Sequence, residues 1–139
     1  MATDSEILRR SRRSANFRVV PSTDWRALLR KRTNVLITGP DLALSAFADL
    51  ARSELREPIR SAGPSLPRLL EGTQTLILTE VDTLDRDSQK RLREWLDQHQ
   101  DVQVVSLTSV NLFALVTKHA FDATLYYRLN AILLDIQPA

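Results

Sequence analysis

A short polar segment that begins at Gly39 follows the apolar run 35–38 and leads into an amphipathic stretch. This layout matches G-x-x-x-x-G-K-[ST], a loop whose backbone amides and Lys cradle phosphates while its hydroxyl binds Mg²⁺. In this chain Leu44 stands at the second Gly, Ser45 at the Lys and Ala46 at the hydroxyl position. The sequence therefore predicts that the frame of a phosphate-binding loop is kept without the groups that bind phosphate and magnesium.

Two further polar segments follow apolar runs. Thr79-Glu80-Val81-Asp82 comes after the run 75–78, and Thr108-Ser109 comes after the run 102–107. The carboxyl ends of parallel strands are where α/β sheets usually carry their chemistry. In a P-loop NTPase the first of these segments would hold Mg²⁺ through an Asp and polarise water through a Glu. The Asp position is Thr79 here, whereas Glu80 and Asp82 remain.

The elements that must position these segments alternate along the chain. Strands are predicted at 34–38, 59–62, 75–78, 102–107 and 132–136. Helices are predicted from a cap at Ser22 or Thr23 to about 32, from a cap at Asp41 to about 57, from a cap at Asp85 or Asp87 through Leu96, and over 111–119 and 123–129. A turn or linker is expected at 63–67 and a helical turn at 68–71. Strands separated by helices indicate a parallel sheet that is covered on both faces.

Composition narrows the classes of function. The 139 residues contain no Cys, which excludes thiolate metal sites and cysteine nucleophiles, and His99 and His119 lack ligand spacing. We therefore expect no metal and no cofactor. No apolar run is long enough to span a membrane and no secretion signal is visible, so a cytoplasmic location and no membrane partner are expected.

The basic residues are concentrated at the N-terminus, although the formal net charge is only +2. Residues 1–20 are interpreted as a basic arm and residues 21–139 as one α/β domain. The arm holds a cluster of arginines, namely Arg9, Arg10, Arg12, Arg13 and Arg18. Such a cluster is typical of a solvated arm, and it could alternatively contact nucleic-acid phosphates.

Four segments together resemble the sigma-54-dependent transcriptional activators, which are AAA+ ATPases. Residues 35–45 align without a gap on that family's VLITGESGTGKE segment, and residues 72–84 look like GGTLFLDEIDEL. Residues 104–112 are similar to IIAATNRDL, and residues 121–130 resemble FREDLYYRLN. The four matches keep the family's order and cover roughly residues 22–137. The resemblance implies a three-layer αβα fold of the P-loop NTPase (AAA+) type with a mainly parallel sheet.

The same alignment identifies what the family has and this chain lacks. Side chains at Leu42 and Leu44 hinder the turns that wrap phosphate, and Pro40 has no amide hydrogen to offer. Ser109 stands where the family has its sensor Asn. Of the two arginine fingers that the resemblance implies, the first position is Asp122 and the second is Arg128. No GAFTGA-like loop occurs between residues 61 and 72, and the lid subdomain and helix-turn-helix that follow in the family are expected to be absent.

The resulting prediction is a catalytically inactive, AAA+-like regulatory or protein-interaction domain linked to transcription regulation. It has no catalytic residue, and its partner is a second copy or an intact AAA+ protein. Its vestigial nucleotide site comprises Gly39, Pro40, Asp41, Leu44, Ser45, Thr79, Glu80 and Ser109, with Arg128 as the remnant of an arginine finger. The alternatives are a residual weak ATP-binding switch that uses Glu80, or nucleic-acid contact through the arm.

The remaining charged groups also have structural interpretations. Glu80 and Asp82 would then cap the following helix or pair with nearby arginines. Arg128 would form either a contact between subunits or a local salt bridge. Arg91 and Arg93 are predicted to lie on a solvated helix face.

Overall fold

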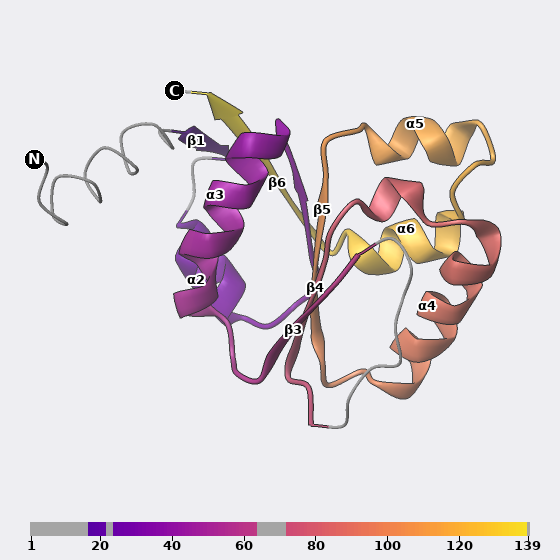
Figure 1. Cartoon of the computed structure of the whole chain (residues 1–139), viewed down its shortest axis with the longest axis horizontal. Coiled ribbons are helices and arrows are strands. Elements are labelled where there is room, and N and C mark those ends of the chain that lie inside the picture. The colour runs from indigo at the N-terminus through magenta and orange to yellow at the C-terminus, as the bar shows by residue number, and fades with distance from the viewer. Residues whose placement is uncertain (1–16, 22–23, 64–71, 139) are drawn as a thin grey trace, which may run out of the picture.

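One six-stranded sheet forms the centre of the molecule (Figure 1). The computed structural model describes residues 17–21, 24–63 and 72–138. The strands are β1 (Phe17–Val20), β2 (Val35–Thr38), β3 (Ile59–Ala62), β4 (Thr75–Leu78), β5 (Gln103–Thr108) and β6 (Ile132–Pro138). They lie in the order β1-β6-β2-β5-β4-β3, and every neighbouring pair is parallel except β1 with β6. The predicted, mainly parallel sheet is confirmed.

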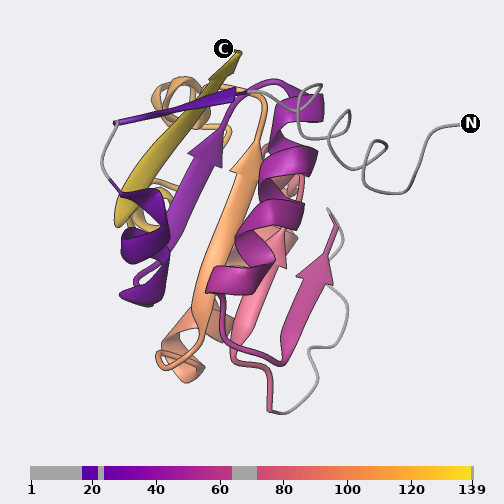
Figure 2. The same cartoon turned by 90° about the vertical axis from the view of Figure 1, so that its left-hand side faces the viewer.

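Helices cover both faces of this sheet. They are α2 (Trp25–Arg30), α3 (Asp41–Ala51), α4 (Arg86–Gln98), α5 (Leu112–Thr117) and α6 (Ala123–Leu129), with short 3₁₀ turns η1 (Arg52–Glu54) and η2 (Val81–Thr83). Helices α2 and α3 lie on one face, onto which Figure 2 looks, and α4, α5 and α6 lie on the other. The predicted three-layer αβα arrangement is therefore confirmed.

The two helical layers enclose two separate cores. Leu36, Leu76 and Leu78 point into the core under α4 to α6, while their strand neighbours Val35 and Ile77 point into the core under α2 and α3. This alternation follows from the two-residue period of a strand. Both sets are buried, which explains why β2 and β4 read as continuous apolar runs.

Strand β1 was not predicted. Phe17 to Val20 pair with the end of β6, and the Phe17 ring packs edge-on against Phe47 of α3 with centroids 5.6 Å apart. Arg18 donates to the side chain of Gln137 on β6 at 2.7 Å. These residues, which were assigned to the basic arm, are therefore part of the sheet. The other arm arginines, at positions 9, 10, 12 and 13, lie outside the described residues.

Two predicted caps were wrong by one or two positions. Helix α2 is capped by Asp24, whose carboxylate accepts hydrogen bonds from the amides of Arg26 and Ala27, and not by Ser22 or Thr23. Asp41 is the first residue of α3, and Pro40 occupies the cap position. At α4 the structure selects Asp85 as the cap.

The other predicted element ends lie within about two residues of the observed ends, except for the end of α3. Helix α3 ends at Ala51, not near residue 57, because η1 tightens the chain and Leu55 is extended. Strand β4 and helix α6 have the predicted bounds, and β3 matches its predicted range. The helical turn predicted at 68–71, with most of the turn predicted at 63–67, lies outside the described residues.

One carboxylate on each side of the sheet has a defined hydrogen-bond partner. Glu54 of η1 accepts hydrogen bonds from Arg30 at 2.6 Å and from Arg26 at 3.3 Å, which ties η1 to α2. The hydrogen bond from Arg30 holds the pKa of Glu54 below its usual value. On the opposite face, the backbone amide of Ser88 donates to Asp85 at 2.7 Å and lowers the pKa of that carboxyl group.

Candidate functional site

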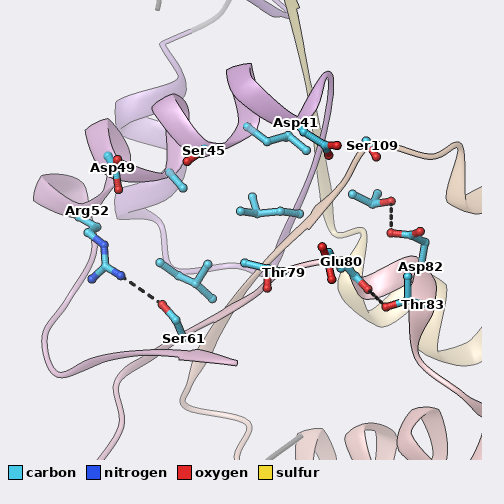
Figure 3. A pocket seen from close by; sticks show the side chains of 15 residues that line it. Asp41, Ser45, Asp49, Arg52, Ser61, Thr79, Glu80, Asp82, Thr83 and Ser109 are labelled. Carbon is cyan, nitrogen blue, oxygen red and sulfur yellow. Dashed lines mark hydrogen bonds between the residues drawn. The ribbon is translucent and has the colours of Figure 1, made fainter. Parts of the chain in front are cut away.

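An open cleft of about 630 Å³ lies between α3 and the carboxyl ends of β4 and β5 (Figure 3). Most of the predicted site residues line it, namely Asp41, Leu44, Ser45, Thr79, Glu80 and Ser109. Gly39 and Pro40 line a neighbouring cavity that also includes Ser109. The fold therefore brings the vestigial phosphate loop, the second polar segment and the sensor position to the same edge of the sheet.

The segment after β2 turns directly into a helix. Helix α3 begins at Asp41, and the amide of Leu44 donates to the Pro40 carbonyl at 2.9 Å, which is a helical hydrogen bond. In a phosphate-binding loop the corresponding residues precede the helix, and their amides are free to face the ligand. Here Asp41 to Leu44 form the first turn of α3 itself, so the amide of Leu44 is used within the helix and only the amides before it lack an intrahelical partner.

Gly39 is required by packing. Its φ is +154°, and a Cβ atom placed on it would lie 2.6 Å from the carbonyl oxygen of Ile136 on β6. Real Cβ contacts are never this short, and backbone atoms cannot move aside as a flexible side chain can. The glycine of the motif frame is therefore explained by close approach of two strands, without reference to any ligand.

The segment after β4 is held by backbone and hydroxyl contacts. The amide of Thr79 donates to the Ala62 carbonyl at 3.0 Å, and its hydroxyl donates to the same oxygen at 3.3 Å. Glu80 adopts a left-handed conformation with φ of 53°, and its carbonyl accepts the Thr83 hydroxyl at 2.7 Å. The hydroxyl at the magnesium-binding position is thus used to extend the pairing of β3 with β4.

A hydrogen bond that the sequence did not predict joins this segment to β5. The buried Thr108 hydroxyl donates to the Asp82 carboxylate at 2.9 Å, and it accepts from the amide of Val110 at 3.1 Å. Asp82 was predicted to cap α4 or to pair with an arginine, and within the described ranges it does neither. Glu80 also has neither predicted role, since Asp85 caps α4 and no ion pair joins Glu80 to another described residue.

The lining of the cleft is acidic. Its charged side chains are Asp41, Asp49, Glu80, Asp82 and Arg52, and Arg52 donates to the Ser61 hydroxyl at 3.1 Å. Figure 3 shows Asp41 and Asp49 on α3, with Glu80 and Asp82 across from that helix. Four carboxylates and one guanidinium give the lining a net negative charge, which disfavours a triphosphate, although the exposure of most of these side chains screens the repulsion. Asp49 and Arg52 were missed, although their helical spacing from Asp41 and Ser45 places them on the same side of α3.

The two arginine-finger positions lie on α6 and contact α4. Arg128 forms an ion pair with Asp97, so the local salt bridge that was one of its two interpretations is present. Asp122 caps α6 by accepting from the amide of Leu125 at 2.7 Å and pairs with Arg93 at 2.9 Å. Arg93 is therefore not simply a solvated side chain, and neither finger position belongs to the cleft beside α3.

Ranges 17–21, 24–63 and 72–138 contain no group of three or more His, Cys, Asp or Glu side chains placed to bind a metal ion. Among the same residues no helix has the length and hydrophobicity needed to cross a bilayer.

Comparison with known proteins identifies a family and solved structures that share this fold. The model of the family described as the sigma-54 interaction domain matches residues 24–138. The chain is 29% identical to the HTH-type transcriptional regulatory protein TyrR of Enterobacter agglomerans, and the match covers 71% of this chain and 23% of that protein.

Solved structures share the fold at lower identity. NtrX from Brucella abortus in complex with ATP has a TM-score of 0.59 at 18% identity, and the match covers 100% of this chain and 37% of NtrX. The P-loop NTPase domain of the sigma-54 transport activator from E. coli has a TM-score of 0.53 at 16% identity, with 97% and 99% of the two chains covered. Because the family model extends over most of its length, the chain belongs to the sigma-54 interaction domain family, a group of AAA+ domains with the P-loop NTPase fold.

Proposed function

We propose that this chain is a catalytically silent sigma-54 interaction domain that takes part in transcription regulation by contacting other proteins. The observation that carries the proposal is the start of α3 at Asp41. A phosphate loop wraps its ligand with the amides of a non-helical segment in front of its helix, and here that stretch is already helical. Pro40 offers no N–H, the Leu44 amide is bonded within α3, and only the amides of Asp41 to Ala43 remain to face a ligand.

The beginning of α3 also repels phosphate electrostatically. A helix N-terminus attracts anions through its exposed amides and its dipole. Asp41 stands in the first turn of α3, so the helix already has a carboxylate where a phosphate would otherwise be stabilised. Asp49 and Glu80 add negative charge to the same cleft.

Magnitudes favour the loss of tight nucleotide binding. Each charged hydrogen bond to phosphate contributes about 1.5–3 kcal/mol. The loss of the Lys, the magnesium ligands and several amides removes roughly 6–10 kcal/mol, although such terms do not add strictly. Millimolar affinity corresponds to only about 4 kcal/mol in total. The residues present therefore do not fit a magnesium–nucleotide complex.

A folded domain that does not bind nucleotide can still bind other proteins through its surface. The family relationship makes either a second copy or an intact AAA+ protein the expected partner, and a silent subunit in such an assembly would reduce its activity. NtrX, which has the same fold, was solved with ADP and with ATP. That comparison provides the positive control that a test of silence requires.

The experiment combines ATP turnover with light scattering after size-exclusion chromatography, each with and without nucleotide. We expect no turnover above buffer and a molar mass that does not depend on ATP. An active sigma-54 activator domain serves as the positive control, and a mixture of the two proteins tests whether this chain lowers the activator's turnover. Turnover by this chain alone would contradict the proposal.

A residual ATP switch is the alternative that Glu80 keeps open, because its exposed carboxylate lies at the cleft in Figure 3. A thermal midpoint that rises with ATP in the wild-type chain and not in Glu80→Ala would favour the switch over silence. An unchanged midpoint in both proteins is the result expected here.

A further inference from the structure

A second pocket, of about 460 Å³, lies on the opposite face of the sheet between α4 and the turn that joins α5 to α6. Its lining is rich in basic side chains, namely Arg86, Lys90, Arg93 and His119. We call this pocket the basic pocket. It shares no lining residue with the cleft of the vestigial nucleotide site.

The cations of α4 share one side of the helix. Arg86, Lys90 and Arg93 are spaced i, i+4 and i+7, so their Cα atoms are displaced along the axis by about 6 Å and about 4.5 Å in turn. Like charges at such spacing destabilise a helix by a few tenths of a kcal/mol per pair unless an anion lies between them. The arrangement therefore favours binding of an anion along α4.

The lining of this pocket contains little negative charge, although Asp85, Asp87 and Glu94 lie nearby on or beside α4. Asp122 is the one carboxylate in the lining, and it is already bound to Arg93 and to the amide of Leu125. The side chains of Arg86 and Lys90 form no ion pair within the described residues, and both are exposed. Two cations at the pocket thus remain available to an external anion.

The walls of the basic pocket are fixed to one another by Gln89. This buried side chain donates to the carbonyl of Leu84 at 2.8 Å and to that of Ala120 at 3.2 Å, and it accepts from the amide of Asp122 at 2.9 Å. These bonds hold the turn between α5 and α6 against α4. The backbone that carries the cations is therefore fixed before a ligand binds, which lowers the backbone part of the entropy cost of binding.

We propose that the basic pocket binds the phosphate backbone of DNA, independently of base sequence. A DNA strand carries one negative charge at every nucleotide, so neighbouring phosphates can meet Arg86 and Lys90 in turn. An acidic protein segment would need apolar anchors as well, and the lining offers few: Phe121 is 3% exposed and packed in the core, which leaves the half-buried Val116 and two alanines. The proposal does not depend on the silence of the nucleotide cleft.

The test measures fluorescence anisotropy of a short labelled DNA duplex with the full chain, over a series of salt concentrations. The pocket variant is Arg86→Gln with Lys90→Gln. The control variant, Arg56→Gln with Arg60→Gln, removes the same charge from exposed side chains outside the pocket. The N-terminal arginines are present in both proteins, so the difference between the two variants reports the pocket alone.

We expect the pocket variant to bind about tenfold more weakly at low salt, with a salt slope smaller by about two. The control variant should lose much less affinity, and Arg86→Lys with Lys90→Arg should keep wild-type binding because the charge is preserved. Equal losses in the pocket and control variants would overturn the proposal. Wild-type binding to a polyglutamate peptide and not to DNA would also overturn it, as would undiminished DNA binding by the pocket variant.

Discussion

Two pockets on opposite faces of one sheet carry opposite charge. The cleft beside α3 has the position of a nucleotide site, yet its charged lining is four carboxylates and one arginine. The basic pocket beside α4 has three Arg or Lys side chains, one His and one paired carboxylate. The position in the fold predicts phosphate binding at the cleft beside α3, whereas the charge of the lining predicts it at the basic pocket. The difference shows that the position of a site in the fold and the charge of its lining can predict different ligands, and our proposals follow the charge.

The largest expected effect is at Gly39, the glycine of the phosphate-loop frame that precedes α3. Gly39→Ala should reduce the free energy of unfolding by about 2–4 kcal/mol, because the new Cβ atom would strike the Ile136 carbonyl. Urea denaturation measures the change. Gly63→Ala is the matched control, since no atom lies within 4 Å of a Cβ there. Equal stability of the two variants would show that Gly39 is not retained for packing.

The next effect compares two buried hydroxyls on β5. Thr108→Val should cost about 1–2 kcal/mol, because it leaves the Asp82 carboxylate and the Val110 amide without this partner. Ser106→Ala is the control, because the buried Ser106 hydroxyl has no hydrogen-bond partner among the described residues. Its removal should be neutral or stabilising by up to about 1 kcal/mol. Chemical denaturation of both variants distinguishes a hydroxyl that organises the cleft from one that does not.

A smaller effect should appear as the pH falls. Arg30 lowers the pKa of Glu54 on the α3 face, and the Ser88 amide lowers the pKa of Asp85 on the α4 face. A carboxyl group whose pKa is lowered by folding stabilises the folded state at pH values above its ordinary pKa of about 4. This stabilisation is lost as the pH falls through the pKa that the group has in the folded state. Thermal midpoints of the wild type and of Glu54→Gln should therefore converge in acid. A constant gap between them would contradict the ion pair.

Much of the fold could be predicted because local pattern and tertiary context agree. Strand β4 is a continuous apolar run that both cores bury, and α6 starts after an Asp that caps it, so both were placed correctly. Strand β1 was missed because four residues beside a run of arginines carry little pattern of their own, and pairing with β6 is a long-range contact.

The candidate site could be predicted in part. The sequence placed the vestigial residues at strand ends, and the parallel sheet gathered most of them into one cleft. It did not identify Thr108 as the partner of Asp82, because a hydrogen bond between two segments depends on their register across the sheet. The basic pocket was also missed, since His119 joins the α4 cations only through the packing of α5 and α6 against α4.

Calorimetric titration of the full chain with ATP and Mg²⁺ tests most directly whether the first turn of α3 has replaced the phosphate cradle. We expect no saturable heat for the wild type. We expect the same for Ser45→Lys, because a restored ammonium group cannot recreate the loop that the helix occupies. Micromolar binding by the wild-type chain would contradict the account.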